Sequence, residues 1–146
     1  MYNGSFEQYD SCPDNGGQVN RALYWFSANN GLGGSAEYFN ACDNPGICGV
    51  PNNFIGGHHF AKTGNAYAGI MLYENVSEYR EYIEGILTSP LQTNAHYYVS
   101  FHVSLSNYAS FGIDALGAYF TNDSLITHSA LAHLVDAERI KKQINP

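Results

Sequence analysis

The stretch Asn3-Gly4-Ser5-Phe6-Glu7 opens the chain with a pattern typical of a first strand entering a β-sandwich. Successive side chains of a strand point to opposite faces. Phe6 would therefore anchor the strand in a core, while Glu7 would point the other way and offer its carboxylate to a cation such as calcium. The alternative is an ordinary edge strand with a solvated Glu7, and five residues alone do not choose between the two.

Alternation with a period of two predicts further strands in the second half of the chain. These are Asn65–Tyr73, Tyr79–Leu87, His96–Leu105 and Phe111–Phe120. The segment His96–Leu105 shows the clearest pattern, because every second residue is apolar. We expect this apolar face to be buried in the core, and its members are Tyr97, Val99, Phe101, Val103 and Leu105.

The first half of the chain is different, because residues 13–64 are rich in Gly and Asn turn signals. Short strands are expected at Tyr24–Phe26 and Glu37–Phe39. Long loops inside a compact domain are usually functional or cross-linked. The single tryptophan, Trp25, is equally suited to filling the core and to stacking against a sugar.

The composition favours one all-β domain. A chain of 146 residues can bury one sizeable core, and its many Tyr residues suit half-buried strand surfaces. The formal net charge of −7 argues against a nucleic-acid partner, since phosphate binding needs clustered cations. No apolar run approaches the roughly 18 residues that a membrane span requires.

Together with the opening stretch, a series of later motifs resembles, in order, the N-terminal β-sandwich domain of large secreted or outer-membrane proteins of Bacteroidetes-type bacteria. Those proteins carry a gliding-motility-type secretion domain or an outer-membrane-protein-A-like domain further on. The opening is also similar to galactose-binding-like carbohydrate-binding modules. The later motifs are Ser11–Pro13, Tyr38–Cys42, Gly49–Phe54, Thr63–Gly69, Tyr79–Ile83, Leu87–Leu91 and Gly117–Phe120.

The resemblance implies a jelly-roll-like antiparallel β-sandwich with a loop-rich N-terminal half. It pairs Cys12 with Cys42 in a disulfide, which implies an oxidising compartment and hence a secreted or cell-surface protein. Cys48 is then left over, and it could instead compete for Cys42 across the short turn between them. Three reduced thiols are the remaining alternative.

The resemblance runs from about Asn3 to Phe120, and we expect residues 1–128 to form the sandwich domain. Residues 129–146 are expected to form an extended connection or a short helix, since Leu131, Leu134 and Val135 have helical spacing. The related domains continue into closing strands, one of which supplies an Asp that completes the cation site beside Glu7. Without those strands the sandwich would have an open edge, which invites pairing with another chain as a homo-oligomer or polymer.

The function expected from the sequence is that of a non-catalytic extracellular or cell-surface module that binds a glycan or a surface protein. Aromatic rings and neighbouring polar groups would contact the ligand. The alternative is a structural subunit of a surface filament or array. No catalytic motif is present, and Glu81, Glu84 and Asp114 are the carboxylates that a hydrolase would need. The candidate ligand-binding residues are Trp25, Tyr82, Tyr98 and His102, and Glu7 is the candidate ligand of a structural calcium ion.

Overall fold

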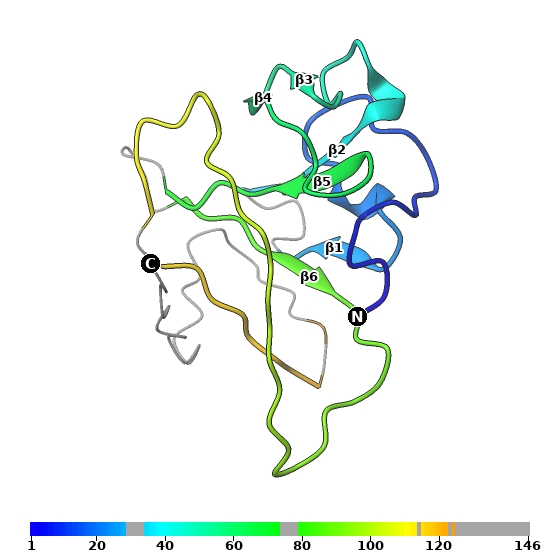
Figure 1. Ribbon diagram of the computed structural model, residues 1–146, viewed down its shortest axis with the longest axis vertical. Helices are drawn as coiled ribbons and strands as arrows, with labels where there is room; N and C mark the ends of the chain where they lie inside the picture. Colours follow the sequence, from blue (N-terminus) through cyan, green and yellow to red (C-terminus); the bar gives the residue numbers. More distant parts are fainter. Residues whose placement is uncertain (29–33, 74–78, 114, 123, 125–146) are drawn as a thin grey trace.

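The computed structural model describes residues 1–28, 34–73, 79–113, 115–122 and 124 (Figure 1). These residues contain short strands and two single turns of 3-10 helix, and no α-helix occurs among them. The all-β prediction is therefore confirmed for this part of the chain. The elements are η1 (Val19–Arg21), β1 (Trp25–Ser27), β2 (Glu37–Asn40), η2 (Ala41–Asp43), β3 (Asn52–Asn53), β4 (Gly57–His58), β5 (Ala66–Gly69) and β6 (Ile83–Gly85).

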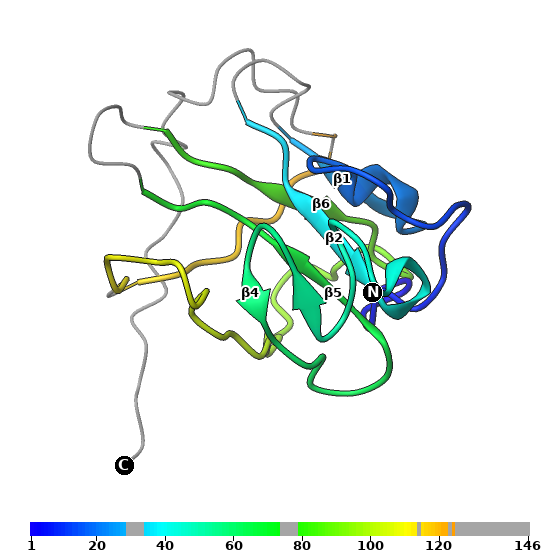
Figure 2. The same ribbon diagram turned by 90° about the horizontal axis from the view of Figure 1, so that it is seen from above.

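The strands pair in three antiparallel, two-stranded sheets: β1 with β6, β2 with β5, and β3 with β4. Figure 2 shows β2 and β5 side by side, with β1 and β6 next to them. The strands predicted at Tyr24–Phe26 and Glu37–Phe39 are confirmed to within one residue as β1 and β2. Those predicted at Asn65–Tyr73 and Tyr79–Leu87 are confirmed only in part, as β5 near the start of the first and β6 in the second half of the other.

The main hydrophobic core lies between the β1–β6 and β2–β5 pairs and is built around Tyr38 and Trp25. Trp25 is 7% exposed, and its ring stacks on Phe6 with 4.4 Å between ring centroids. Its Nε1 donates a hydrogen bond to the Asn3 carbonyl oxygen (2.8 Å). The other buried members are Val19, Ala22, Ala36 and Ala66. A second, smaller cluster consists of Phe39, Cys48 and Val50.

The opening stretch does not form the predicted strand. Residues 2–5 form a turn, and both Asn3 and Phe6 have positive φ angles (47° and 64°). The cause is local: the Asn3 side chain donates to the carbonyl oxygens of Gln8 and Leu23 and accepts from Gln8 N. Such side-chain bonds to the backbone compete with strand pairing. Phe6 nevertheless packs against the core, as predicted.

Glu7 is directed to the start of β5. Its Oε1 accepts hydrogen bonds from the backbone amides of Asn65 (2.9 Å) and Ala66 (3.0 Å). Gly64 has a φ of +71°, and a Cβ atom there would lie 2.4 Å from the same oxygen, so the close approach requires glycine. The carboxylate thus fixes the loop that leads into β5.

The segment His96–Leu105 is the clearest error of the sequence-based prediction. Its backbone is not part of any sheet, and the side chains expected in the core are exposed by 46% at Tyr97, 51% at Phe101 and 68% at Val103. Alternating apolar and polar residues show that a segment suits a sheet. A β-strand also requires a neighbouring backbone whose hydrogen-bonding groups are free to pair with it. The described residues of Phe111–Phe120 likewise belong to no strand.

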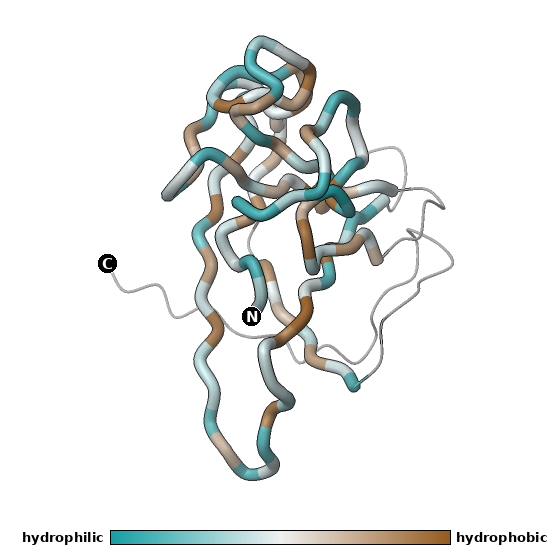
Figure 3. Tube along the Cα trace, turned by 90° about the vertical axis from the view of Figure 1, so that its right-hand side faces the viewer, coloured by the Kyte–Doolittle hydropathy of each residue, from teal (hydrophilic) through white to brown (hydrophobic). Residues whose placement is uncertain are grey.

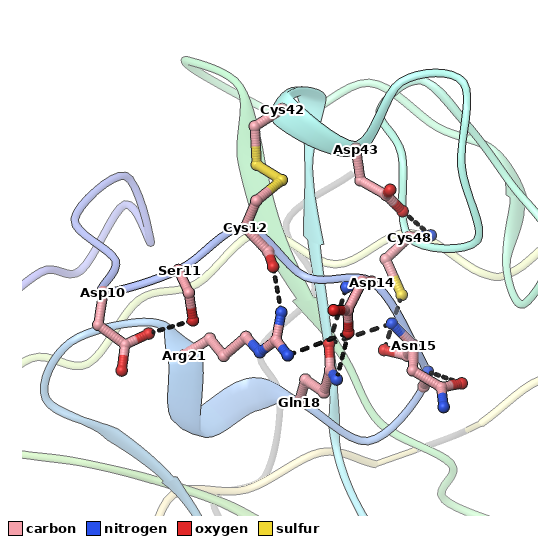
Figure 4. Close-up of polar contacts among 11 residues, drawn as sticks. Asp10, Ser11, Cys12, Asp14, Asn15, Gln18, Arg21, Cys42, Asp43 and Cys48 are labelled. Carbon is pink, nitrogen blue, oxygen red and sulfur yellow. Dashed lines mark hydrogen bonds and ion pairs between the residues drawn. A yellow bond between two sulfur atoms is a disulfide. The ribbon is translucent and has the colours of Figure 1, made fainter.

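The predicted Cys12–Cys42 disulfide is present and joins the loop before η1 to η2, with 6.0 Å between the Cα atoms (Figure 4). Arg21 supports this loop, because it donates to the Cys12 carbonyl oxygen and pairs with Asp14 (3.0 Å). Cys48 is a buried free thiol, 3.1 Å from the Asn15 carbonyl oxygen. Burial raises the pKa of Cys48 to about 12, so the thiol stays protonated and unreactive.

The buried carboxylate of Glu81 connects the segment before β2 with the segment after β5. Glu81 is 5% exposed, and it accepts hydrogen bonds from the backbone amides of Ser35 (3.0 Å) and Met71 (2.7 Å) and from the Tyr79 hydroxyl (3.0 Å). Its Oε1 and Oε2 atoms thereby hold together segments that are distant in sequence. The neighbouring Glu37 accepts from the Gly17 amide. Burial, and then the negative charge of Glu81, raise the pKa of Glu37.

Within the described ranges, no helix has the length and apolar character of a membrane-spanning segment. The C-terminal connection predicted for residues 129–146 lies outside the described residues.

Removal of the disulfide tests how much the loop-rich half depends on it. The cross-link joins residues 30 positions apart, for which the chain-entropy account gives about 3 to 4 kcal/mol. In urea titrations, we expect the free energy of unfolding of the double variant Cys12→Ser/Cys42→Ser to be lower by this amount. The control Cys48→Ala, measured under oxidising conditions, should retain the cross-link. An unchanged urea midpoint in the double variant would contradict this account.

Glu7→Ala should leave the part-buried Ala66 amide without its acceptor, at a cost of about 1 to 3 kcal/mol, whereas water can replace the acceptor at the exposed Asn65 amide. Glu7→Gln, which keeps an acceptor oxygen, should cost less. Thermal unfolding with a chelator and with calcium separates this role from metal binding: the loss in Glu7→Ala is expected under both conditions. A loss that appears only with calcium present would show that Glu7 acts through the ion instead.

The raised pKa of Glu37 makes stability depend on pH. A carboxyl group with a higher pKa in the folded state stabilises the protein at low pH, and this contribution is lost as the pH rises through the folded-state value. Glu37→Gln cannot ionise, so its free energy of unfolding should fall less than that of the wild type between acid and neutral pH. Urea titrations across that range measure the slope. A slope in Glu37→Gln equal to that of the wild type would refute the assignment.

Candidate functional site

A pocket of about 560 Å³ lies beside the β3–β4 hairpin. It is formed by three segments: the turn after η2, the hairpin itself, and the turn around Asn107. Figure 1 shows β3 and β4 together at one end of the molecule. The lining residues are Asn44, Pro45, Gly46, Asn52, Asn53, Phe54, Gly57, His58, Asn107 and Tyr108. None of them carries a carboxylate or a basic amine, so amides and aromatic rings dominate the surface that a ligand would meet.

The buried Asn53 holds the hairpin in shape. Its Oδ1 accepts from the backbone amides of Gly56 (2.6 Å) and Gly57 (3.2 Å), which closes the turn. Its Nδ2 donates to the Gly49 carbonyl oxygen (3.3 Å) and to the Tyr67 hydroxyl (3.0 Å). Burial raises the pKa of Tyr67, whereas the hydrogen bond from Asn53 opposes this shift. All of the polar atoms of the Asn53 side chain are thus used in building the pocket floor.

Asn107 attaches a distant turn to the hairpin. Its Oδ1 accepts from His58 N (2.6 Å), and its backbone amide donates to the Gly56 carbonyl oxygen (3.0 Å). The Ser106 hydroxyl donates to the same carbonyl (3.0 Å). Gly57 has a φ of +98°, and a Cβ there would lie 2.5 Å from Asn107 Oδ1. The contact therefore requires glycine at position 57.

The groups that remain available for a ligand are aromatic faces and amide donors. Phe54 is 82% exposed and Tyr108 is 66% exposed, although both line the pocket. Among the described residues, the side-chain Nδ2 groups of Asn52 and Asn107 donate to no other group. His58 Nδ1 lies 2.7 Å from Asn52 Oδ1, so a neutral ring that donates from Nδ1 keeps Nε2 as an acceptor.

Aromatic rings continue beyond the pocket rim. His58 packs edge-on against Phe60, with 5.4 Å between ring centroids. Phe60 is 74% exposed. Large apolar side chains that are exposed in a group, next to a depression, mark binding surfaces more often than single exposed ones do.

The structure places the four ligand-binding candidates elsewhere. Trp25 fills the core, which is one of the two alternatives that the sequence left open. Tyr82 is half-buried, and its carbonyl oxygen accepts from Ala28 N, next to the β1–β6 pair. Tyr98 is 99% exposed and His102 is exposed, both on the extended segment 96–105. None of the four lines the pocket.

The predicted cation site at Glu7 has one carboxylate, whose Oε1 already serves two backbone amides. In the described part of the chain, no group of three or more His, Cys, Asp or Glu side chains is placed to hold a metal ion. Calcium binding at Glu7 stays a prediction.

Sequence reasoning missed the pocket because its residues are split between two regions of the chain. A usable signal was present in the run Asn52-Asn53-Phe54, which precedes a Gly-Gly-His-His turn. Amide and aromatic residues beside a glycine turn are candidates for a rigid, exposed binding loop. The pairing of this run with Asn107 and Tyr108 could not be read from the sequence.

The chain was compared with protein families, curated proteins and solved structures, and none of the three comparisons gave a match.

Proposed function

We propose that the protein is a non-catalytic glycan-binding module that acts outside the cell or on its surface. The observation that carries the proposal is the pocket in which exposed Phe54 and Tyr108 flank the amides of Asn52 and Asn107. Sugars present apolar C–H faces and a rim of hydroxyl groups. Aromatic rings match the former and amides match the latter, which is the combination that small-molecule sites use.

Rigidity supports this function. The turn bonds of Asn53 and the attachment through Asn107 hold the pocket backbone before any ligand arrives. A preformed site loses less conformational entropy on binding than a mobile one. The rings that contact a ligand would therefore not need to be ordered first.

The same geometry favours binding over hydrolysis. Glycosidases usually place two carboxyl groups across the scissile bond, and no lining residue is Asp or Glu. Glu81, one of the three carboxylates considered from the sequence, is buried and accepts hydrogen bonds from two backbone amides and a tyrosine hydroxyl. Asp114 lies outside the described residues.

The Cys12–Cys42 disulfide supports a secreted or cell-surface location, because such bonds persist in oxidising compartments. We further propose that the antiparallel strand pairs belong to a jelly-roll-like sandwich of the kind found in galactose-binding-like modules. A surface protein that displays similar polar and aromatic groups is the alternative partner for the same pocket.

Alanine substitution distinguishes the pocket from the residues suggested by the sequence. A glycan array probed with the wild-type protein should give hits, and titration with the strongest hit supplies an affinity. Phe54→Ala and Tyr108→Ala should each weaken that affinity by about tenfold or more, as expected for a central aromatic contact.

The matched control is Tyr98→Ala, which removes a fully exposed aromatic ring outside the pocket and should leave the affinity unchanged. Loss of binding in Tyr98→Ala, with Phe54→Ala unaffected, would move the site to the 96–105 segment. An array without any hit would refute glycan binding.

A further inference from the structure

Residues 96–105 form an extended segment whose backbone makes no hydrogen bond to any other described backbone group. Figure 1 shows it as a yellow-green trace that runs along the long axis of the molecule. Figure 3 shows apolar and polar positions alternating along one limb of a loop that projects from the body. The segment therefore has the side-chain pattern of a β-strand, and no strand in the described part of the chain pairs with it.

Both faces of this segment are open to solvent. The apolar face carries Phe101 and Val103, which are 51% and 68% exposed. The polar face carries Tyr98, which is 99% exposed, together with His102. Exposed apolar side chains in such a continuous row are costly in water. A neighbouring strand would cover part of each face and satisfy the backbone groups at the same time.

The distribution of charge singles out the same region. No Asp, Glu, Lys or Arg occurs between Glu84 and Asp114. Natural proteins usually protect exposed strand edges with charged residues or proline, and residues 96–105 contain neither. Because the whole chain carries a net charge of −7, two copies repel each other over much of their surface. The uncharged segment is where they can approach without that repulsion.

We propose that residues 96–105 pair, antiparallel, with the same residues of a second copy of the chain. A twofold axis at Phe101 places Val99 opposite Val103 and Tyr97 opposite Leu105, so the apolar face of one copy continues into that of the other. Odd-numbered residues meet odd-numbered residues in this register, and the polar faces match in the same way. The interface is isologous, as in most closed dimers.

The sequence itself favours a second copy as the occupant. An antiparallel pair of identical alternating strands keeps both faces in register automatically, whereas another partner would need its own uncharged, alternating strand. The C-terminal residues 136–142 include Asp136, Glu138, Arg139, Lys141 and Lys142. Segment 96–105 has no Asp, Glu, Lys or Arg to pair with these charges, so the C-terminal residues suit it less well than a second copy does.

Sedimentation equilibrium over a range of protein concentrations tests the proposal. The wild type should shift from monomer to dimer as the concentration rises. Phe101→Lys places two positive charges opposite each other at the proposed axis and should remain monomeric. The matched control is Phe60→Lys, which introduces the same charge at an exposed phenylalanine outside the segment and should dimerise like the wild type.

Hydrogen–deuterium exchange locates the contact. Backbone amides of residues 96–105 should become protected as the wild-type concentration rises, and should stay unprotected in Phe101→Lys. A wild type that is monomeric at every concentration would overturn the proposal, as would dimers of Phe101→Lys or protection confined to other residues. Phe54→Ala should dimerise normally, so failure of glycan binding and failure of this pairing are separate results.

Discussion

Backbone hydrogen-bonding groups that are buried need partners in a folded protein, and in this one polar side chains supply many of these partners. The strands are two to four residues long, so their ladders satisfy only a small part of the backbone. Asn3, Glu7, Asn40, Asn53 and Glu81 each accept hydrogen bonds from one or more backbone amides. At Asn40, Asn53 and Glu81 the donating amides are part-buried, so removing the side chain would leave them without an acceptor at a cost in stability.

The pocket follows from the same constraint. Asn53 and Asn107 use their Oδ1 atoms to hold the hairpin and the adjoining turn. The hydrophobic cluster beneath, built on Phe39 and Val50, supports them through Tyr67, whose ring stacks on Phe39 at 4.8 Å. Asn53 and Asn107 form the polar contacts of the pocket, and Phe39 and Val50 form the apolar ones. Phe54 and Tyr108 belong to neither set and stay at the surface. Exposure of these rings is a product of how the hairpin is built.

The local pattern of residue types in the sequence was sufficient to predict some features of the fold and not others. The short strands β1 and β2 could be predicted from residue type and local pattern. The core role of Phe6 could be predicted because a large apolar side chain tends to be buried, although the strand expected to carry it does not form. The Cys12–Cys42 pairing came from resemblance, since spacing alone leaves Cys48 as a competitor. The turn at Asn3 could not be predicted, because it depends on a side chain reaching Leu23.

The error at His96–Leu105 has a different origin. Alternation reports that a segment has two unlike faces, but it carries no information on whether another strand lies alongside. The pocket was missed for a related reason, because Asn53 and Asn107 meet only through tertiary structure. Trp25 shows the limit for single residues. A core ring and a sugar-stacking ring have the same sequence signature, and its burial in the main cluster identifies it as core.

The extended 96–105 segment also affects which proteases can cleave this protein. Proteases bind their substrates as extended chains, and this segment already has that conformation at the surface. Enzymes that cut after Lys or Arg find no such residue between Arg80 and Arg139. Enzymes that cut after aromatic residues find Tyr97, Tyr98 and Phe101 within a few positions. The molecule therefore resists one class of digestive enzyme along this stretch while presenting a cleavage site to the other.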